Sequence, residues 1–220
     1  MVDIVDPGEG ILIDSSQLIR PAPRGVPLRK VVYDMLDGDE LSADGEGFDE
    51  VSMSVSLVFD NAEPFTVSWR VWQPYECLTT LEMWQGSEKD PLTRVWQKMV
   101  ADWAVVPAQA GETYILRKSS DVSSRWSHLL GARVIGQYVA MGETGWGDHQ
   151  PWSCRLEFDN GQSLVVCLGE MVGGMPSYLP DSLLVTGSRE VAMSYCPHGA
   201  DSSAWAEDAQ CQQSNEAKRR

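Results

Sequence analysis

The sequence has no long hydrophobic run. No stretch of it approaches the roughly 20 consecutive apolar residues that a membrane-spanning helix needs. Residues 1–7 include neither the basic region nor the apolar stretch of a secretory signal peptide. We therefore expect a cytoplasmic protein that does not bind membranes.

Positive charge is also scarce. The chain has 17 Lys and Arg against 32 Asp and Glu, which gives a formal net charge of −15. This excess repels the phosphates of nucleic acids and anionic lipid surfaces, so we do not expect nucleic-acid binding. The imbalance is greatest from Val31 to Trp69, where no Lys or Arg occurs. The ten acids of this stretch are Asp34, Asp37, Asp39, Glu40, Asp44, Glu46, Asp49, Glu50, Asp60 and Glu63.

The acid-rich segment, which we define as Asp34–Glu50, allows three interpretations. It is typical of a solvated loop that keeps a protein soluble. It also suits a docking surface for a basic partner protein, since complementary charge speeds encounter and fixes orientation. A calcium loop is the third interpretation, but Leu41 interrupts the alternating oxygen ligands that an EF-hand requires. In the docking interpretation the contacting residues are Asp37, Asp39, Glu40, Asp44, Glu46, Asp49 and Glu50.

Residue patterns of known metal and catalytic sites are missing. The three His residues, His128, His149 and His198, do not have the spacing that places two ligands on one helix face. There is no nucleophile elbow and no phosphate-binding or dinucleotide-binding glycine pattern. We therefore expect neither a metal nor a cofactor.

The five Cys residues are an odd number spread along the chain, which favours reduced, buried thiols over a disulfide framework. Cys154 and Cys167 lie within apolar strand patterns. An enzyme of unfamiliar type stays open as an alternative, with Cys154, Cys167 or His149 in a cleft. A nucleophile and its base meet in space, and their distance in sequence does not exclude such a site.

The chain contains enough apolar residues to form a hydrophobic core. Its hydrophobic content is 43% and it has nine Trp residues, so it is too apolar for a disordered chain. From Met53 to Phe59 apolar side chains alternate with serines, and alternation resumes from Phe65 to Val71 after a turn at Asp60-Asn61. This period of two predicts a half-buried β-hairpin.

A second hairpin with the same pattern is predicted near the C-terminus. Trp152 to Phe158 and Leu164 to Leu168 flank the turn Asp159-Asn160-Gly161, and both Asn and Gly tolerate the positive φ of tight hairpin turns. An offset of 99 positions relates the two hairpins without a gap. The sequence therefore predicts an internal duplication.

Between the two hairpins an amphipathic helix is expected. Asp90-Pro91 is typical of a helix start, and apolar residues recur at helical spacing from Leu92 to Trp103. The predicted fold class is α+β and β-rich, with two duplicated antiparallel β modules and this one linking helix. The expected domains are residues 1–85 (first β repeat), 86–130 (helical linker packed on the sheets), 131–197 (second β repeat) and 198–220 (flexible tail).

Smaller elements complete the prediction. Leu183–Val185 and Val191–Tyr195 are expected to be closing strands, and Asp121–Leu130 a short helix. The loop from Gly142 to His149 is rich in Gly and contains Trp146. Either Trp146 folds back on the core or it is an exposed anchor for a partner, in which case it joins the acidic residues as a binding residue.

The duplicated, acidic pattern without enzyme motifs, with the hairpin Leu156-Glu157-Phe158-Asp159-Asn160-Gly161, resembles small bacterial immunity proteins of polymorphic toxin systems. The resemblance covers the two hairpin regions, 31–69 and 134–168, and implies a stoichiometric inhibitor that binds a cognate toxin domain. The alternatives are the Cys/His enzyme and a structural or assembly module in which the duplication builds a pseudo-symmetric interface.

Overall fold

The structure is a computed structural model, and it describes residues 19–36, 41, 47–72, 75–85, 117–143, 149–178, 182–197, 200 and 203–205. Strands predominate in these residues. The strands are β1 (Leu28–Leu36), β2 (Asp49–Val51), β3 (Ser54–Phe59), β4 (Phe65–Trp72), β5 (Tyr75–Gln85), β6 (Arg117–Asp121), β7 (Val134–Glu143), β8 (His149–Phe158), β9 (Ser163–Leu168), β10 (Glu170–Val172), β11 (Met175–Ser177) and β12 (Leu183–Thr186). The helical elements are the 3₁₀ turn η2 (Ser127–Leu129) and the helix α2 (Arg189–Met193).

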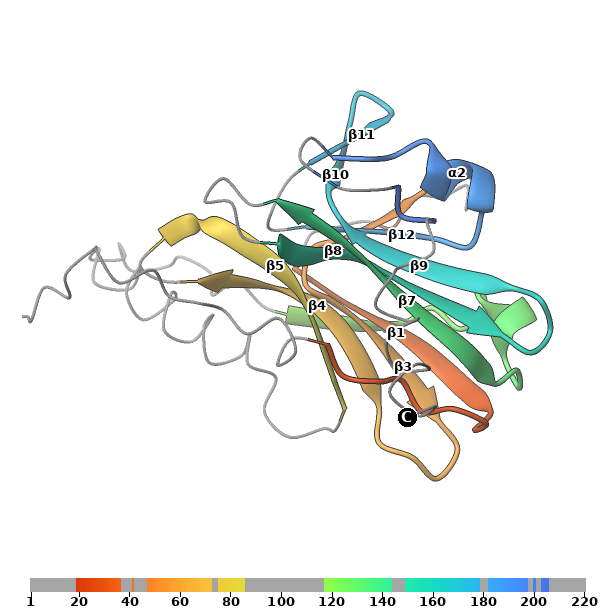
Figure 1. The fold of residues 1–220 in the computed structure, drawn as a ribbon. Coiled ribbons are helices and arrows are strands. Elements are labelled where there is room, and N and C mark those ends of the chain that lie inside the picture. The colour runs from red at the N-terminus through yellow and green to blue at the C-terminus, as the bar shows by residue number, and fades with distance from the viewer. Residues whose placement is uncertain are drawn as a thin grey trace, which may run out of the picture.

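Two five-stranded antiparallel sheets pack against each other (Figure 1). The first sheet has the strand order β5-β4-β3-β1-β6, and the second has the order β2-β12-β9-β8-β7. A separate hairpin joins β10 to β11. The predicted β-rich α+β fold with antiparallel sheets is confirmed.

The inner faces of the two sheets share one hydrophobic core, and both predicted hairpins contribute to it. In the first hairpin β3 pairs with β4, and in the second β8 pairs with β9. The apolar residues that alternation assigned to the inside are buried wherever the structure describes their side chains. They include Val55, Leu57, Phe65 and Val67 in the first sheet, and Cys154, Leu156, Phe158, Leu164 and Val166 in the second.

The turns of these hairpins have the backbone geometry that their residues favour. Asn61 adopts a φ of 52°, and Gly161 adopts a φ of 79°. Asn160 is fixed from outside the hairpin, since its Nδ2 donates to the carbonyl oxygen of His128 at 2.7 Å. Both turns therefore agree with the sequence prediction.

Each sheet contains a three-stranded antiparallel meander, β1-β3-β4 in one and β7-β8-β9 in the other. This common order is consistent with duplication, which stays a prediction. The first half of the chain is not confined to the first sheet, because β2 leaves it and pairs with β12 at the edge of the second. Both halves of the chain therefore contribute strands to the second sheet.

Three smaller predictions had different outcomes. Val191–Tyr195 is not a strand: residues Arg189–Met193 form α2, and the Ser188 side chain caps it by accepting from the amide of Val191 at 3.3 Å. Residues 121–130 contain the short η2 turn where a helix was expected. Leu183–Val185 is confirmed as part of β12. The predicted helix over 90–103 lies outside the described residues.

A third layer covers part of the outer face of the second sheet. Ala192 of α2 and Ala204 are buried, and Ala200 forms an isolated bridge with Gly142 of β7. A flexible tail was expected from His198 onward, but the described residues Ala200 and 203–205 pack against the sheet. Positions on this face that strand alternation would assign to solvent are consequently buried as well.

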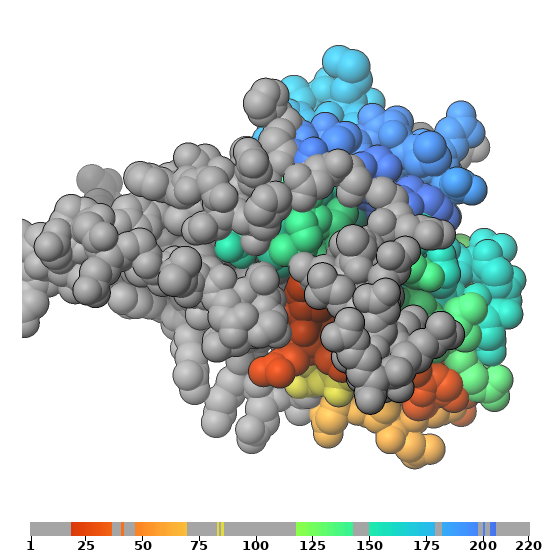
Figure 2. Space-filling view, viewed as in Figure 1, coloured from red at the N-terminus to blue at the C-terminus, as the bar shows by residue number. Residues whose placement is uncertain are grey.

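The β10–β11 hairpin projects from the top of the molecule in light blue (Figure 2). Gly173 and Gly174 form its tip, with φ values of 59° and 83°, which glycine adopts without strain. Val172 and Met175 beside the tip are largely exposed. No helix in the described part of the chain is long and apolar enough to cross a membrane.

Candidate functional site

The structure describes only part of the acid-rich segment. Asp34 ends up buried near the end of β1, Asp49 is buried in β2, and Glu50 is exposed. The other predicted partner-binding residues lie outside the described residues, namely Asp37, Asp39, Glu40, Asp44, Glu46 and Trp146. Leu41, in the middle of the segment, packs against the core.

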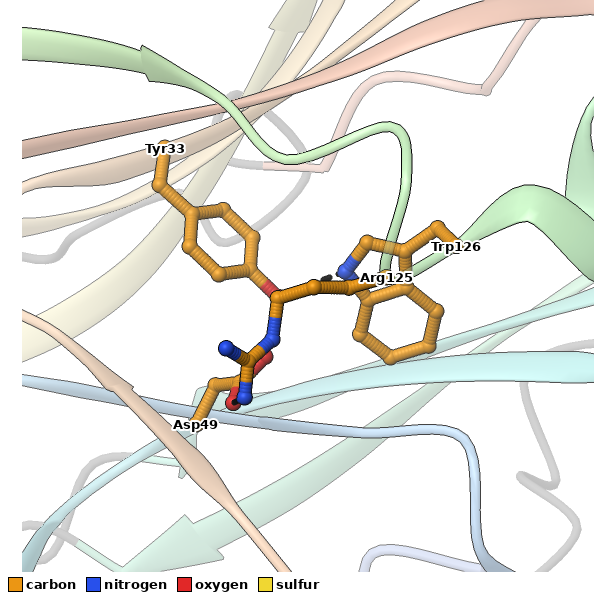
Figure 3. Close-up of polar contacts among 4 residues, drawn as sticks. All are labelled: Tyr33, Asp49, Arg125 and Trp126. Atoms are coloured by element: carbon orange, nitrogen blue, oxygen red, sulfur yellow. Dashed lines mark hydrogen bonds and ion pairs between the residues drawn. The ribbon is translucent and has the colours of Figure 1, made fainter. Parts of the chain in front are cut away.

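Asp49 is the centre of a buried polar cluster between the two sheets (Figure 3). Arg125 donates to Oδ1 of Asp49 over 2.7 Å, and the hydroxyl of Tyr33 donates to Oδ2 over 3.0 Å. Trp126 Nε1 in turn donates to the Tyr33 hydroxyl at 2.8 Å. Since Tyr33 belongs to the first sheet and Asp49 to the second, this cluster joins the two sheets.

The protonation of Tyr33 is fixed by its surroundings. Burial raises the pKa of Tyr33 far above its ordinary value, and the negative charge of Asp49 raises it further. The hydroxyl therefore keeps its proton and acts as a donor to Asp49. Asp49 thus has a structural role inside the fold, and its carboxylate is not presented to a partner.

The other two described acids of the segment are also engaged. Asp34 accepts a hydrogen bond from the Ser54 hydroxyl at 2.8 Å and another from the Ser119 hydroxyl. Glu50 lies on the surface and accepts from the backbone amide of Met171 in β10 at 3.1 Å. Of the described acids in the segment, Glu50 alone is exposed.

The cysteines proposed for an enzyme site are buried. Cys154 is 1% exposed in the core, and Cys167 is fully buried in β9 with its thiol directed at the Leu184 carbonyl oxygen. Burial raises the pKa of Cys154 to about 12 and that of Cys167 higher still. A thiol that stays protonated is a poor nucleophile. His149 lies in β8, and its side chain is outside the described set.

The rate of alkylation should distinguish the buried thiols from an exposed one. At mildly alkaline pH, iodoacetamide should modify the exposed Cys196 at least about a hundredfold faster than Cys154 and Cys167, which become reactive only when the protein unfolds. Peptide mass mapping over time measures each rate. Rapid modification of Cys154 or Cys167 in the folded protein would contradict their burial and would revive the enzyme alternative.

A cavity of about 650 Å³ opens on the outer face of the second sheet. We call it the Arg155 cavity. Strands β8 and β9 form its floor, and α2 and residues 203–205 form its walls. Six of the residues that line it are Arg155, Glu157, Ser163, Arg189, Met193 and Trp205.

Arg155 lies on the floor of this cavity. Its side chain is 3% exposed, and its guanidinium lies between two aromatic rings, 4.2 Å from the ring centroid of Tyr138 and 4.8 Å from that of Trp205. Its NH1 donates to the carbonyl oxygen of Trp205 at 2.7 Å, and its NH2 lies 3.5 Å from Oε1 of Glu157. Nε has no hydrogen-bond partner in the described structure.

No pattern in the sequence predicted this site. Ser153, Arg155 and Glu157 alternate with apolar residues in β8, a pattern typical of a solvated strand face. The only available signal was Trp205, an aromatic residue in an otherwise polar C-terminal stretch. Its pairing with Arg155 depends on the way residues 203–205 return to the sheet.

Known proteins do not supply a function for this chain. We compared it with protein-family models, with curated proteins and with solved structures, and none of the three comparisons found a match. Among the described residues, no group of three or more His, Cys, Asp or Glu is placed to hold a metal ion.

Proposed function

We propose that this protein is a stoichiometric binding protein that inhibits a basic partner, and that the partner is a cognate bacterial toxin domain. The observation that carries the proposal is the acid-rich segment in a chain of net charge −15. Many toxins that act on nucleic acids or nucleotides have basic clefts, and an acidic segment can occupy the place of the phosphates. Inhibition by charge complementarity needs no catalytic group.

The ends of the segment support this proposal. The chain leaves the first sheet at Leu36, the last residue of β1, and enters the second at Asp49, the first residue of β2. Between these points Leu41 and Phe48 pack against the core. The acids that are available for docking are therefore tethered to a rigid scaffold at both ends, which lowers the entropy that binding costs.

Neutralising part of the segment tests the proposal. The variant D39N/E40Q/D44N should associate with the partner about tenfold more slowly than the wild type at low salt, with a smaller change in the dissociation rate, because these charges act mainly on the encounter. The partner for the assay is the product of the neighbouring gene. Surface plasmon resonance at two ionic strengths measures both rates.

A matched variant controls for net charge. The triple substitution E63Q/E170Q/E190Q removes three acids that lie elsewhere on the described surface, and it should associate at nearly the wild-type rate. Equal slowing of both variants would show that total charge, and not this segment, attracts the partner. If the neighbouring gene's product neither binds this protein nor becomes toxic in its absence, the proposed function is wrong.

The two alternatives predict different behaviour in the same preparation. An assembly module should self-associate as concentration rises, and analytical ultracentrifugation measures this directly. An enzyme should lose activity on substitution of Cys154, Cys167 or His149 while it stays folded. A binding protein should respond to neither and depend on the charge of the acid-rich segment.

A further inference from the structure

We propose that the Arg155 cavity binds a small organic monocarboxylate with an aromatic or aliphatic body. Its volume of about 650 Å³ falls in the range of pockets that enclose small molecules. The cavity lies on the outer face of the second sheet, whereas Asp49 faces the first sheet. The proposed ligand site is therefore separate from Asp49 and the cluster between the two sheets, and it does not depend on the proposed function.

The proposal is supported first by a buried cation that has one donor without an acceptor. Arg155 is 3% exposed, and its Nε has no hydrogen-bond partner in the part of the chain that the structure describes. A buried donor without a partner costs free energy, which an acceptor on a ligand or an ordered water would recover. The guanidinium presents its donors in a planar fork that matches a carboxylate.

Arg155 also anchors the C-terminal segment, but this role does not account for its unpaired Nε. Anchoring uses NH1, which donates to the carbonyl oxygen of Trp205, and the two faces of the guanidinium, which contact Tyr138 and Trp205. These contacts leave Nε unpaired at the edge of the group. They also hold the guanidinium rigidly, which preorganises it for a ligand.

The charge of the lining selects a monoanion. Arg189 adds a second guanidinium, whose central carbon lies 5.7 Å from the ring centroid of Trp205. Glu157 offsets one of the two positive charges, and its carboxylate, 32% exposed, lies 3.5 Å from Arg155 NH2. One net positive charge remains, which suits a single carboxylate, whereas a dianionic phosphate would be repelled by Glu157.

The apolar part of the lining selects the rest of the ligand. Met193 of α2 is 53% exposed and Ile135 of β7 is 56% exposed, and both border the cavity. Trp205 adds an aromatic ring. Exposed Ile and Met beside a charged floor provide the mixed surface that is typical of small-molecule sites, in which apolar contacts give affinity and a few polar groups fix orientation.

Phenylacetate is a suitable probe because it joins one carboxylate to one aromatic ring. Isothermal titration calorimetry on the full chain should detect its binding, and phenylacetamide, which has the same shape without the charge, should bind at least about tenfold more weakly. In NMR spectra the Nε–H resonance of Arg155 should shift on addition of phenylacetate. Phenyl phosphate tests the charge preference and should bind more weakly than phenylacetate.

Substitution of Arg189 provides the decisive variant, because its exposed side chain can be removed without disturbing the sheet. R189A should weaken phenylacetate binding about tenfold. R29A is the matched control: it removes an exposed arginine, paired with Asp60 on the other sheet, and should bind phenylacetate like the wild type. Equal binding of phenylacetamide, stronger binding of phenyl phosphate, wild-type affinity in R189A or an unmoved Arg155 resonance would each overturn the proposal.

Discussion

Replacing Asp49 by Asn should lower the free energy of unfolding by about 3 kcal/mol, because it removes one partner of a buried ion pair and leaves the other charged. The Asp49 side chain is 7% exposed, and that of Arg125 is 23% exposed. The amide also cannot accept from Arg125 and from Tyr33 as a carboxylate does. Urea unfolding monitored by tryptophan fluorescence measures the change.

Asp60→Asn is the matched control for this prediction. Asp60 pairs with Arg29, whose side chain is 67% exposed, so the loss of that pair should change stability by less than about 1 kcal/mol. A similar loss in both variants would mean that burial gives the Asp49 pair no special strength. A double variant that also replaces Arg125 measures how much of the lost stability depends on the pair.

Arg125→Met in the Asp49→Asn background should recover part of the lost stability. Removing both partners removes both charges of the pair, and Met keeps most of the apolar length of the arginine stem. The difference between the double variant and the sum of the single variants gives the coupling free energy of the pair. A coupling near zero would show that Asp49 acts through Tyr33 alone.

The inner half of this fold could be predicted because its signal is local. Period-two alternation assigned Val55, Leu57 and Leu156 to a buried face, and the sheets bury them. The turn residues Asn61 and Gly161 fixed the hairpins in the same way. Pairing between neighbouring strands joined by a short turn needs no information from distant parts of the chain.

The outer face of the second sheet could not be predicted, because its burial depends on distant residues. Arg155 and Cys167 alternate with core residues and would face solvent in a two-layer protein. Instead both are buried, and α2 and residues 203–205 enclose the cavity that Arg155 lines. The alternation of Val191, Met193 and Tyr195 resembled a strand, although Ser188 carried the helix-capping signal that decided the outcome.

The cluster around Asp49 was missed for a related reason. A strand of three residues, Asp49–Val51, is too short to show a period, and its position after several acids made it look like part of a surface loop. Arg125 lies far along the chain, so no local pattern joins it to Asp49. This acidic stretch therefore contains two structural acids, Asp34 and Asp49, beside the acids to which the proposed function assigns partner binding.

Gly169→Ala should lower the free energy of unfolding by about 3 kcal/mol, since it combines backbone strain with a steric clash. Gly169 joins β9 to β10 with a φ of 153°. A Cβ atom there would lie 2.7 Å from the Tyr195 hydroxyl, 2.8 Å from the Ser177 carbonyl oxygen and 2.9 Å from Cδ1 of Leu184. The Tyr195 hydroxyl donates to the Leu168 carbonyl oxygen at 2.6 Å and has little room to move.

Gly174→Ala provides the comparison that isolates the clash. Gly174 has a φ of 83° at the tip of the β10–β11 hairpin, and a Cβ there would have no atom within 4 Å, so its cost should be the backbone term of about 1–2 kcal/mol. Tyr195 follows α2, which carries Arg189 and Met193 to the Arg155 cavity. Displacing Tyr195 in Gly169→Ala should therefore also weaken phenylacetate binding, whereas Gly174→Ala should leave it unchanged. Equal stability losses and equal affinities in the two variants would contradict the close packing at Gly169.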